Sequence, residues 1–236
     1  MRVLLFIFVL SFSAFAQSPL VGRTLAAANE SAREKDYEKA IEKYRTAAMF
    51  AETERLSDDY LAKIHFNVGV CLYHLKRTAE AVAEYEAAIK LSRREYGKAF
   101  YALGMAHKDL KNRRKAVAAL RAAVRISRAD GEAWFDLALI YLEEKDFAAA
   151  REAFENSIKH RSVNSSDAHN NLGVIAALEG DWISAERKFQ TALLESNGAS
   201  IEAKGNLQFC KFYKENYKST DWLAKLEFSR TEKRGE

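Results

Sequence analysis

Few residues of this chain have the types and spacing that chemistry requires. The sequence contains no Gly-rich phosphate loop, no GxSxG nucleophile elbow and no HExxH zinc motif. Cys71 and His74 are three residues apart and would share one face of a helix, but a zinc ion generally takes four ligands. The other histidines are His65, His107, His160 and His169. The sequence therefore predicts neither an enzyme nor a metal or cofactor site.

The elements around these residues are repeated along the chain. A small residue recurs every 34 or 35 positions, and an alanine and a bulky residue follow it at fixed distances. The small residues are Gly69, Gly104, Ala138 and Gly173; the alanines are Ala81, Ala116, Ala150 and Ala185; the bulky residues are Tyr85, Leu120, Phe154 and Phe189. A small residue permits close approach of two paired helices, and the bulky residue fills the space between layers. One helix pair cannot bury such a face alone, so the pattern predicts stacked pairs.

The spacing resembles that of the tetratricopeptide repeat family, over about residues 25–215. The resemblance implies an all-α, right-handed solenoid of antiparallel helix pairs. We expect units at 21–54, 62–96, 97–130, 131–165 and 166–200, then a half unit at 201–217 and a capping helix with a basic tail at 218–236. About seven extra residues, from Thr53 to Tyr60, predict a longer helix or loop after the first unit.

Two local features bear on the turns. Lys145-Asp146-Phe147 and Gly180-Asp181-Trp182 predict turns between paired helices. The proline that the family carries near the end of each unit is absent, which leaves the geometry of the inter-repeat turns open. The residues there are Arg93, Arg128, Ser162 and Asn197.

The family implies that first helices line a concave groove for a peptide or a partner helix. We carry this over to the second, fifth, ninth and twelfth residues of each unit, which share one helix face. They are Lys63, Phe66, Val70 and Tyr73; Lys98, Tyr101, Met105 and Lys108; Glu132, Phe135, Leu139 and Leu142; and Asp167, Asn170, Val174 and Ala177. Phe66, Tyr101 and Phe135 would form an aromatic ladder, and Asn67, Asp136 and Asn171 beside them would bond a peptide backbone. The alternative is that neighbouring repeats or the C-terminal segment bury these side chains.

One subfamily of the tetratricopeptide repeat proteins binds C-terminal carboxylates through Lys, Asn and Arg side chains. Asn29, Asn67 and Lys98 align with three of its five positions, whereas Leu25 and Ala102 replace the other two. The sequence therefore matches this carboxylate clamp only in part.

A second binding surface is suggested by local charge. The 37 Lys and Arg residues nearly balance the 33 Asp and Glu, and a net charge of +4 does not by itself indicate a nucleic-acid-binding protein. However, Arg114, Arg121, Arg125 and Arg128 fall within about 40° of one line at 100° per residue, on the side opposite the apolar residues of their helix. This stripe is either a solvated face or a dock for anionic lipid, envelope polymer or an acidic protein.

The N-terminus predicts export. Met1-Arg2 precedes the apolar run from Val3 to Leu10, and Ala14-Phe15-Ala16 provides a cleavage site. We expect cleavage after Ala16; the alternative, an uncleaved anchor, has an apolar run shorter than the roughly 20 residues that span a bilayer. Cys71 and Cys210 would lie four repeats apart and remain unpaired.

Together these patterns predict a non-catalytic, periplasmic or secreted scaffold. It would bind a peptide or helix of a partner protein, in the assembly of a cell-envelope complex. The alternatives are a surface-docking protein that uses the Arg stripe and a non-catalytic accessory subunit of an envelope enzyme. We expect no nucleic acid and no small-molecule substrate.

Overall fold

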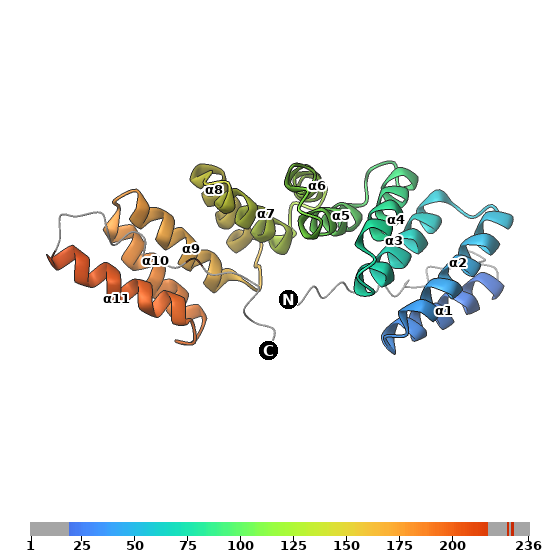
Figure 1. Ribbon diagram of the computed structural model, residues 1–236, viewed down its shortest axis with the longest axis horizontal. Coiled ribbons are helices and arrows are strands. Elements are labelled where there is room, and N and C mark those ends of the chain that lie inside the picture. The colour runs from blue at the N-terminus through green and yellow to red at the C-terminus, as the bar shows by residue number, and fades with distance from the viewer. Residues whose placement is uncertain (1–18, 217–225, 227, 229–236) are drawn as a thin grey trace. The chain divides into compact units, whose positions relative to one another are not determined.

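The computed structural model describes residues 19–216, 226 and 228, and within these residues it contains eleven helices and no strand (Figure 1). The chain divides into two compact units, which we describe separately. The N-terminal unit contains α1 (Pro19–Arg33), α2 (Tyr37–Thr53), α3 (Asp58–His74), α4 (Thr78–Leu91), α5 (Gly97–Asp109) and α6 (Arg113–Ile126). The C-terminal unit contains α7 (Gly131–Glu143), α8 (Phe147–Lys159), α9 (Ser165–Leu178), α10 (Trp182–Glu195) and α11 (Ile201–Asn216).

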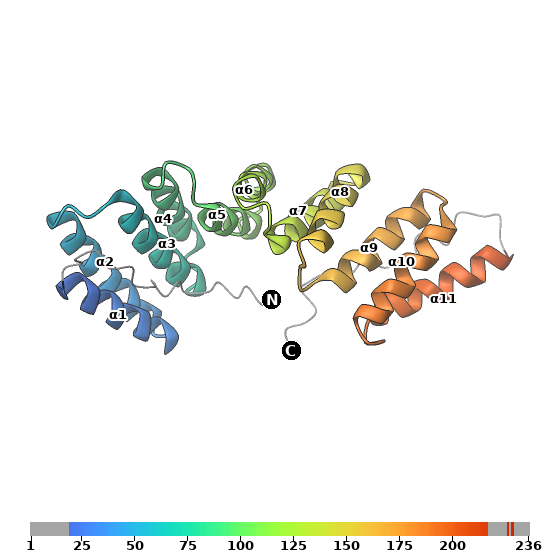
Figure 2. The same ribbon diagram turned by 180° about the vertical axis from the view of Figure 1, so that it is seen from behind.

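Within each unit, consecutive helices lie side by side, as both views show (Figures 1 and 2). The pairs are α1 with α2, α3 with α4 and α5 with α6 in one unit, and α7 with α8 and α9 with α10 in the other, where α11 packs on α10 and α9. The all-α fold of stacked helix pairs that the repeats predict is therefore confirmed.

The spacing of small and bulky residues has the predicted physical cause. A Cβ atom added to Gly69 would lie 2.6 Å from the ring of Tyr85, and one added to Gly173 would lie 2.6 Å from the ring of Phe189. Both rings are fully buried. The glycine in the first helix of a pair thus creates the space that the aromatic ring of the second helix fills, and this is what joins the two helices.

Both turns within the helix pairs of the C-terminal unit are held by aspartate. Asp146 and Asp181 cap α8 and α10, and their carboxylates accept hydrogen bonds from Ala149 N at 3.1 Å and Ser184 N at 3.0 Å. The residue before each aspartate, Lys145 or Gly180, has a left-handed backbone that ends the preceding helix. Both predicted turns are confirmed.

The turns between the repeats contain no proline. Arg93 and Asn197 adopt left-handed conformations with φ of 50° and 51°. After α8 a carboxylate holds the turn: Glu132 accepts hydrogen bonds from Ser162 Oγ at 2.8 Å and from Val163 N at 2.7 Å. The Glu132 side chain therefore stabilises a turn through hydrogen bonds and does not line a groove.

The lengths of the helices account for the extra residues after the first unit. Both α2 and α3 have 17 residues, against 13 or 14 in each of the helices from α4 to α10. Of the segment 218–236, the structure describes Leu226 and Phe228, and neither lies in a helix. The predicted cap residues Trp222 and Leu223 lie outside the described residues.

Three histidines, of which His107 is buried and His169 half-buried, predict a stability that falls with acidification. Desolvation by burial lowers the pKa of His74, His107 and His169 below the usual 6.5. Because the unfolded chain binds these protons first, the contribution of the neutral rings is present above pH 6.5 and is lost as the pH falls through the lowered values. The urea midpoint should be lower at pH 5.5 than at pH 7.5, and the fall should be shallower in His107→Gln. A midpoint that rises on acidification would contradict this account.

Candidate functional site: the inner faces of the first helices

We define the inner face of a first helix as the side that carries the second, fifth, ninth and twelfth residues of its unit, where the sequence places the groove. The inner faces of α3, α5, α7 and α9 differ sharply in exposure. Those of α3 and α9 are largely buried, that of α7 keeps Glu132 and Leu142 half-buried, and that of α5 is the most open to solvent of the four.

On α3 the inner face is mostly internal packing. Phe66 is 2% exposed, and its ring centroid lies 6.0 Å from that of Tyr85 and 5.1 Å from that of Tyr96. Val70 is fully buried in the same cluster. The Tyr73 hydroxyl donates a 2.5 Å hydrogen bond to Asp109, which ties α3 to the end of α5. The expectation that Phe66 and Val70 face an open groove is therefore wrong, because neighbouring rings and the second helix cover them.

The inner face of α5 is different. Lys98 is exposed, Tyr101 and Lys108 are half-buried, and only Met105 is buried. Lys63 of α3, which packs directly against α5, is also half-buried. We call Lys63, Lys98, Tyr101 and Lys108 the cationic inner face. It combines three ammonium groups with one aromatic ring, a suitable surface for a segment that carries carboxylates.

In the C-terminal unit most of the predicted groove residues are buried, whereas Glu132 and Leu142 are half-buried. The buried ones include Phe135, Asp136, Leu139, Asn170, Asn171 and Val174. Phe135 is 0% exposed and its ring meets that of Phe154 edge-on, with 5.6 Å between centroids. Phe135 is therefore a core residue, and the predicted open ladder of Phe66, Tyr101 and Phe135 reduces to Tyr101.

The buried amides of α9 bond within the protein. Asn206 of α11 donates from Nδ2 to Asn170 Oδ1 at 2.9 Å, with both side chains buried. Asn170 thus joins α9 to α11.

The partial carboxylate clamp is not assembled as an open site. Asn29 is buried and its Oδ1 accepts a 2.5 Å hydrogen bond from the Tyr44 hydroxyl. Asn67 is also buried, and Lys98 alone of the three is exposed. The side-chain amides of Asn29 and Asn67 therefore contribute to packing within the helix pairs.

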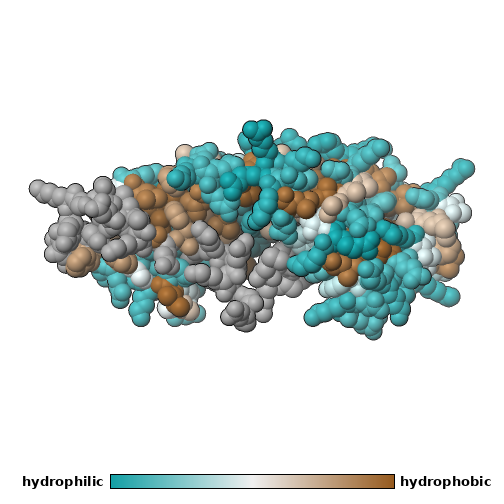
Figure 3. Space-filling view, in the orientation of Figure 1, coloured by the Kyte–Doolittle hydropathy of each residue, from teal (hydrophilic) through white to brown (hydrophobic). Residues whose placement is uncertain are grey.

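The arginine stripe is shorter than predicted. Arg114, Arg121 and Arg125 are exposed on α6, opposite its buried Ala116 and Leu120. Arg128 lies beyond Ile126, the last residue of α6, and its carbonyl accepts a 3.0 Å hydrogen bond from Trp134 Nε1. Arg128 is thus not part of the helical face, because the helix ends before it. Hydrophilic residues also dominate the surface around α6 in Figure 3.

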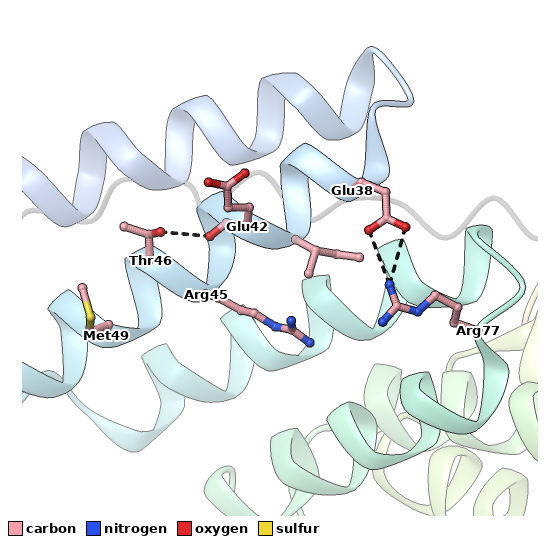
Figure 4. Close-up of a pocket in the computed structure, with 7 residues that line it drawn as sticks. Glu38, Glu42, Arg45, Thr46, Met49 and Arg77 are labelled. Carbon is pink, nitrogen blue, oxygen red and sulfur yellow. Dashed lines mark hydrogen bonds and ion pairs between the residues drawn. The ribbon is translucent and has the colours of Figure 1, made fainter.

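A pocket of about 450 Å³ lies between α2 and the start of α4, and no motif in the sequence indicates it (Figure 4). It is lined by Glu38, Ile41, Glu42, Arg45, Thr46, Met49 and Arg77. Arg77 pairs with Glu38 at 3.4 Å and, through two nitrogens, with Glu80 at 2.7 Å. These ion pairs already engage the charged groups at one end of the pocket, so it defines no ligand chemistry.

Thiols and histidines do not gather into a site among the described residues, which contain no group of three potential metal-ligating side chains. Burial raises the pKa of the Cys71 thiol to about 12, and no disulfide joins Cys71 to Cys210. The His74 ring stacks on Tyr37 with 4.7 Å between centroids. None of the described helices has the length and hydropathy that a membrane crossing requires.

Comparison with known proteins agrees with this architecture. Models of the tetratricopeptide repeat match residues 62–94, 101–162 and 146–200. The chain is therefore a tetratricopeptide-repeat protein across these residues. No curated protein sequence matches it.

Among solved structures, YrrB, a TPR protein with an unusual peptide-binding site, is 22% identical, with a TM-score of 0.59 over 75% of this chain and 86% of its own. PilF of Pseudomonas aeruginosa is 20% identical, with a TM-score of 0.62 over 83% and 82%. MamA from Desulfovibrio magneticus RS-1 is 19% identical, with a TM-score of 0.63 over 78% and 99%. At these identities the likeness establishes the shared fold. Tetratricopeptide repeats are generally non-catalytic scaffolds that bind proteins.

Proposed function

We propose that this protein is an exported scaffold that holds an acidic segment of a partner protein along the cationic inner face. The observation that carries the proposal is the exposure of Lys98, Tyr101 and Lys108 on the inner face that is the most open to solvent of the four. Ammonium groups attract carboxylates, and the tyrosine ring offers a rigid apolar contact with a polar tip. The peptide-binding site of YrrB, a protein of the same fold, supports this use of the architecture.

The compartment is part of the proposal. Residues 1–16, which lie outside the described residues, have the order of a signal peptide: positive start, apolar run and small-residue cleavage site. Cleavage after Ala16 would place the scaffold in the periplasm or outside the cell, where assembly of an envelope complex is the task that we assign to it. Its role is non-catalytic, either as an assembly scaffold or as the accessory subunit of an envelope enzyme.

A second candidate function rests on the exposed Arg114, Arg121 and Arg125 of α6. Their guanidinium groups form an outward face that suits an anionic lipid surface or envelope polymer. This face and three of the four residues of the cationic inner face belong to the α5–α6 pair, so matched substitutions within that pair can separate the two functions.

The test uses two charge-reversal variants of the full chain, Lys98→Glu with Lys108→Glu and Arg121→Glu with Arg125→Glu. Each alters the net charge by the same amount and leaves buried residues untouched. Each tagged chain is crosslinked in the exported fraction of its source, captured and compared by quantitative mass spectrometry, and the recovered chain should begin at Gln17. We expect the lysine variant to lose its bound partner at least tenfold while the arginine variant keeps it.

The opposite pattern, with binding to anionic vesicles or polymer lost in the arginine variant alone, would favour the second function. Equal losses in both variants would show a general charge effect and contradict the inner-face site. A recovered chain that still carries residues 1–16 would contradict export by a cleaved signal.

A further inference from the structure

The helix α9 is buried on every side, unlike its counterpart α5. Its inner-face residues Asp167, Asn170, Val174 and Ala177 are 3%, 0%, 1% and 1% exposed. The adjacent helices cover part of this face, since Asn206 of α11 bonds to Asn170. Two side chains from the far end of the chain also pack in this unit.

The described residues that pack there come from the far end of the chain. Phe228 packs against two hydrophobic clusters, one that contains Phe135 and Leu172 and one that contains Val174 and Phe189. Leu226 packs against the second cluster. Helix α9 is the one helix that supplies residues to both clusters, so it is the element that the contacts of Phe228 have in common.

Leu226 and Phe228 have a spacing that suits an extended ligand. Leu226 and Phe228 lie outside any helix and are both half-buried. In an extended chain, residues two apart point to the same side, so both hydrophobic side chains can face α9 together.

The chain between α11 and this segment is long enough for the contact to be intramolecular. Leu226 stands ten positions after Asn216, and an extended chain that spans ten positions reaches about 33 Å. A tether of this kind holds its ligand at an effective concentration in the millimolar range. A free segment of equal intrinsic affinity would therefore compete poorly with the tethered one.

We propose that the inner face of α9 is a second binding site, for an extended segment with two hydrophobic side chains two residues apart, and that the chain's own Leu226 and Phe228 occupy it. The partner is a protein segment with the same pattern of hydrophobic residues. It binds only when it displaces the internal ligand. This site is independent of the cationic inner face. Displacement of Leu226 and Phe228 from it requires no change in the helices.

The experiment measures binding of a fluorescein-labelled peptide that covers residues 222–232, by fluorescence anisotropy, to three full-length proteins. The first is the wild type, and the second is the double variant Leu226→Ala with Phe228→Ala, which vacates the site. The third is a matched control, Ile201→Ala with Phe212→Ala, which removes two exposed hydrophobic side chains from the same unit. Hydrophobic residues are visible on this end of the unit in Figure 3.

We expect the peptide to bind the double variant at least tenfold more tightly than the wild type and the control. A peptide with alanine at positions 226 and 228 should bind none of the three. Equal binding to wild type and double variant, or binding to neither, would overturn the proposal. A wild type that sediments as a dimer, with a monomeric double variant, would overturn the intramolecular assignment in favour of a second copy.

Circular dichroism checks that the double variant keeps its helices. If the double variant loses its helices, the single variant Phe228→Leu is assayed instead. This substitution keeps an apolar side chain and replaces only the aromatic ring with a smaller aliphatic group. Its affinity for the labelled peptide should lie above that of the wild type. An affinity equal to that of the wild type would then overturn the proposal.

Discussion

Gly131→Ala is expected to lower the free energy of unfolding of the C-terminal unit by about 3 kcal/mol, a value at the upper end for overpacking. A Cβ atom at Gly131 would lie 2.7 Å from Ser162 N, 2.9 Å from His160 O and 3.1 Å from Ser157 O. All three are backbone atoms at the end of α8, where Ser162 N donates to Ser157 O at 3.0 Å. Unlike a side chain, this helix end cannot rotate away from the added methyl group.

Gly205→Ala is the matched control for this prediction. Gly205 lies within α11 of the same unit, and a Cβ atom there would meet nothing within 4 Å. Alanine favours a helix over glycine by about 1 kcal/mol, so this variant should be slightly more stable than the wild type. Urea unfolding followed by circular dichroism measures both. Equal midpoints for Gly131→Ala and the wild type would contradict the close approach of α7 to the end of α8.

Phe135→Ala is expected to cost about 3–5 kcal/mol, the usual range when a fully buried phenylalanine is truncated. The residue is 0% exposed and packs edge-on against Phe154, so its loss leaves a cavity between α7 and α8. Had Phe135 lined a groove, the same change would weaken partner binding and spare stability. The denaturant midpoint therefore decides whether this residue belongs to the core or to a groove.

Phe212→Ala is the control for Phe135→Ala, because it makes the same chemical change in the same unit at a residue that is 54% exposed. A surface change of this kind should alter stability by less than about 1 kcal/mol. If Phe135→Ala proved as mild as Phe212→Ala, the assignment of Phe135 to the core would be wrong.

These predictions bear on how a groove is inferred from repeats. Position five of a unit lies on the inner face of its helix by periodicity alone, and this holds equally for Phe66, Tyr101 and Phe135. Whether that face is open depends on the size of neighbouring side chains. Tyr96, just before α5, contributes to covering Phe66, whereas Tyr101 is left half-buried. Inner position is therefore not the same as accessibility.

The sequence by itself determined the repeat architecture, because each helix pair is specified by short-range features. A glycine opposite a bulky ring, as in Gly69 and Tyr85, and an aspartate that caps the second helix, as in Asp146, act within one repeat. Their recurrence every 34 or 35 residues is enough to identify the pairs.

The tertiary structure decided which inner faces remain open and which cations share a surface. Helix α6 ends at Ile126, which separates Arg128 from the arginines of α6. Phe228 closes the C-terminal unit from about 50 residues beyond α9, at a distance in the chain that no repeat period encodes. The physical reason is that burial depends on every atom that approaches a side chain, whereas periodicity records only neighbours within the helix and its pair.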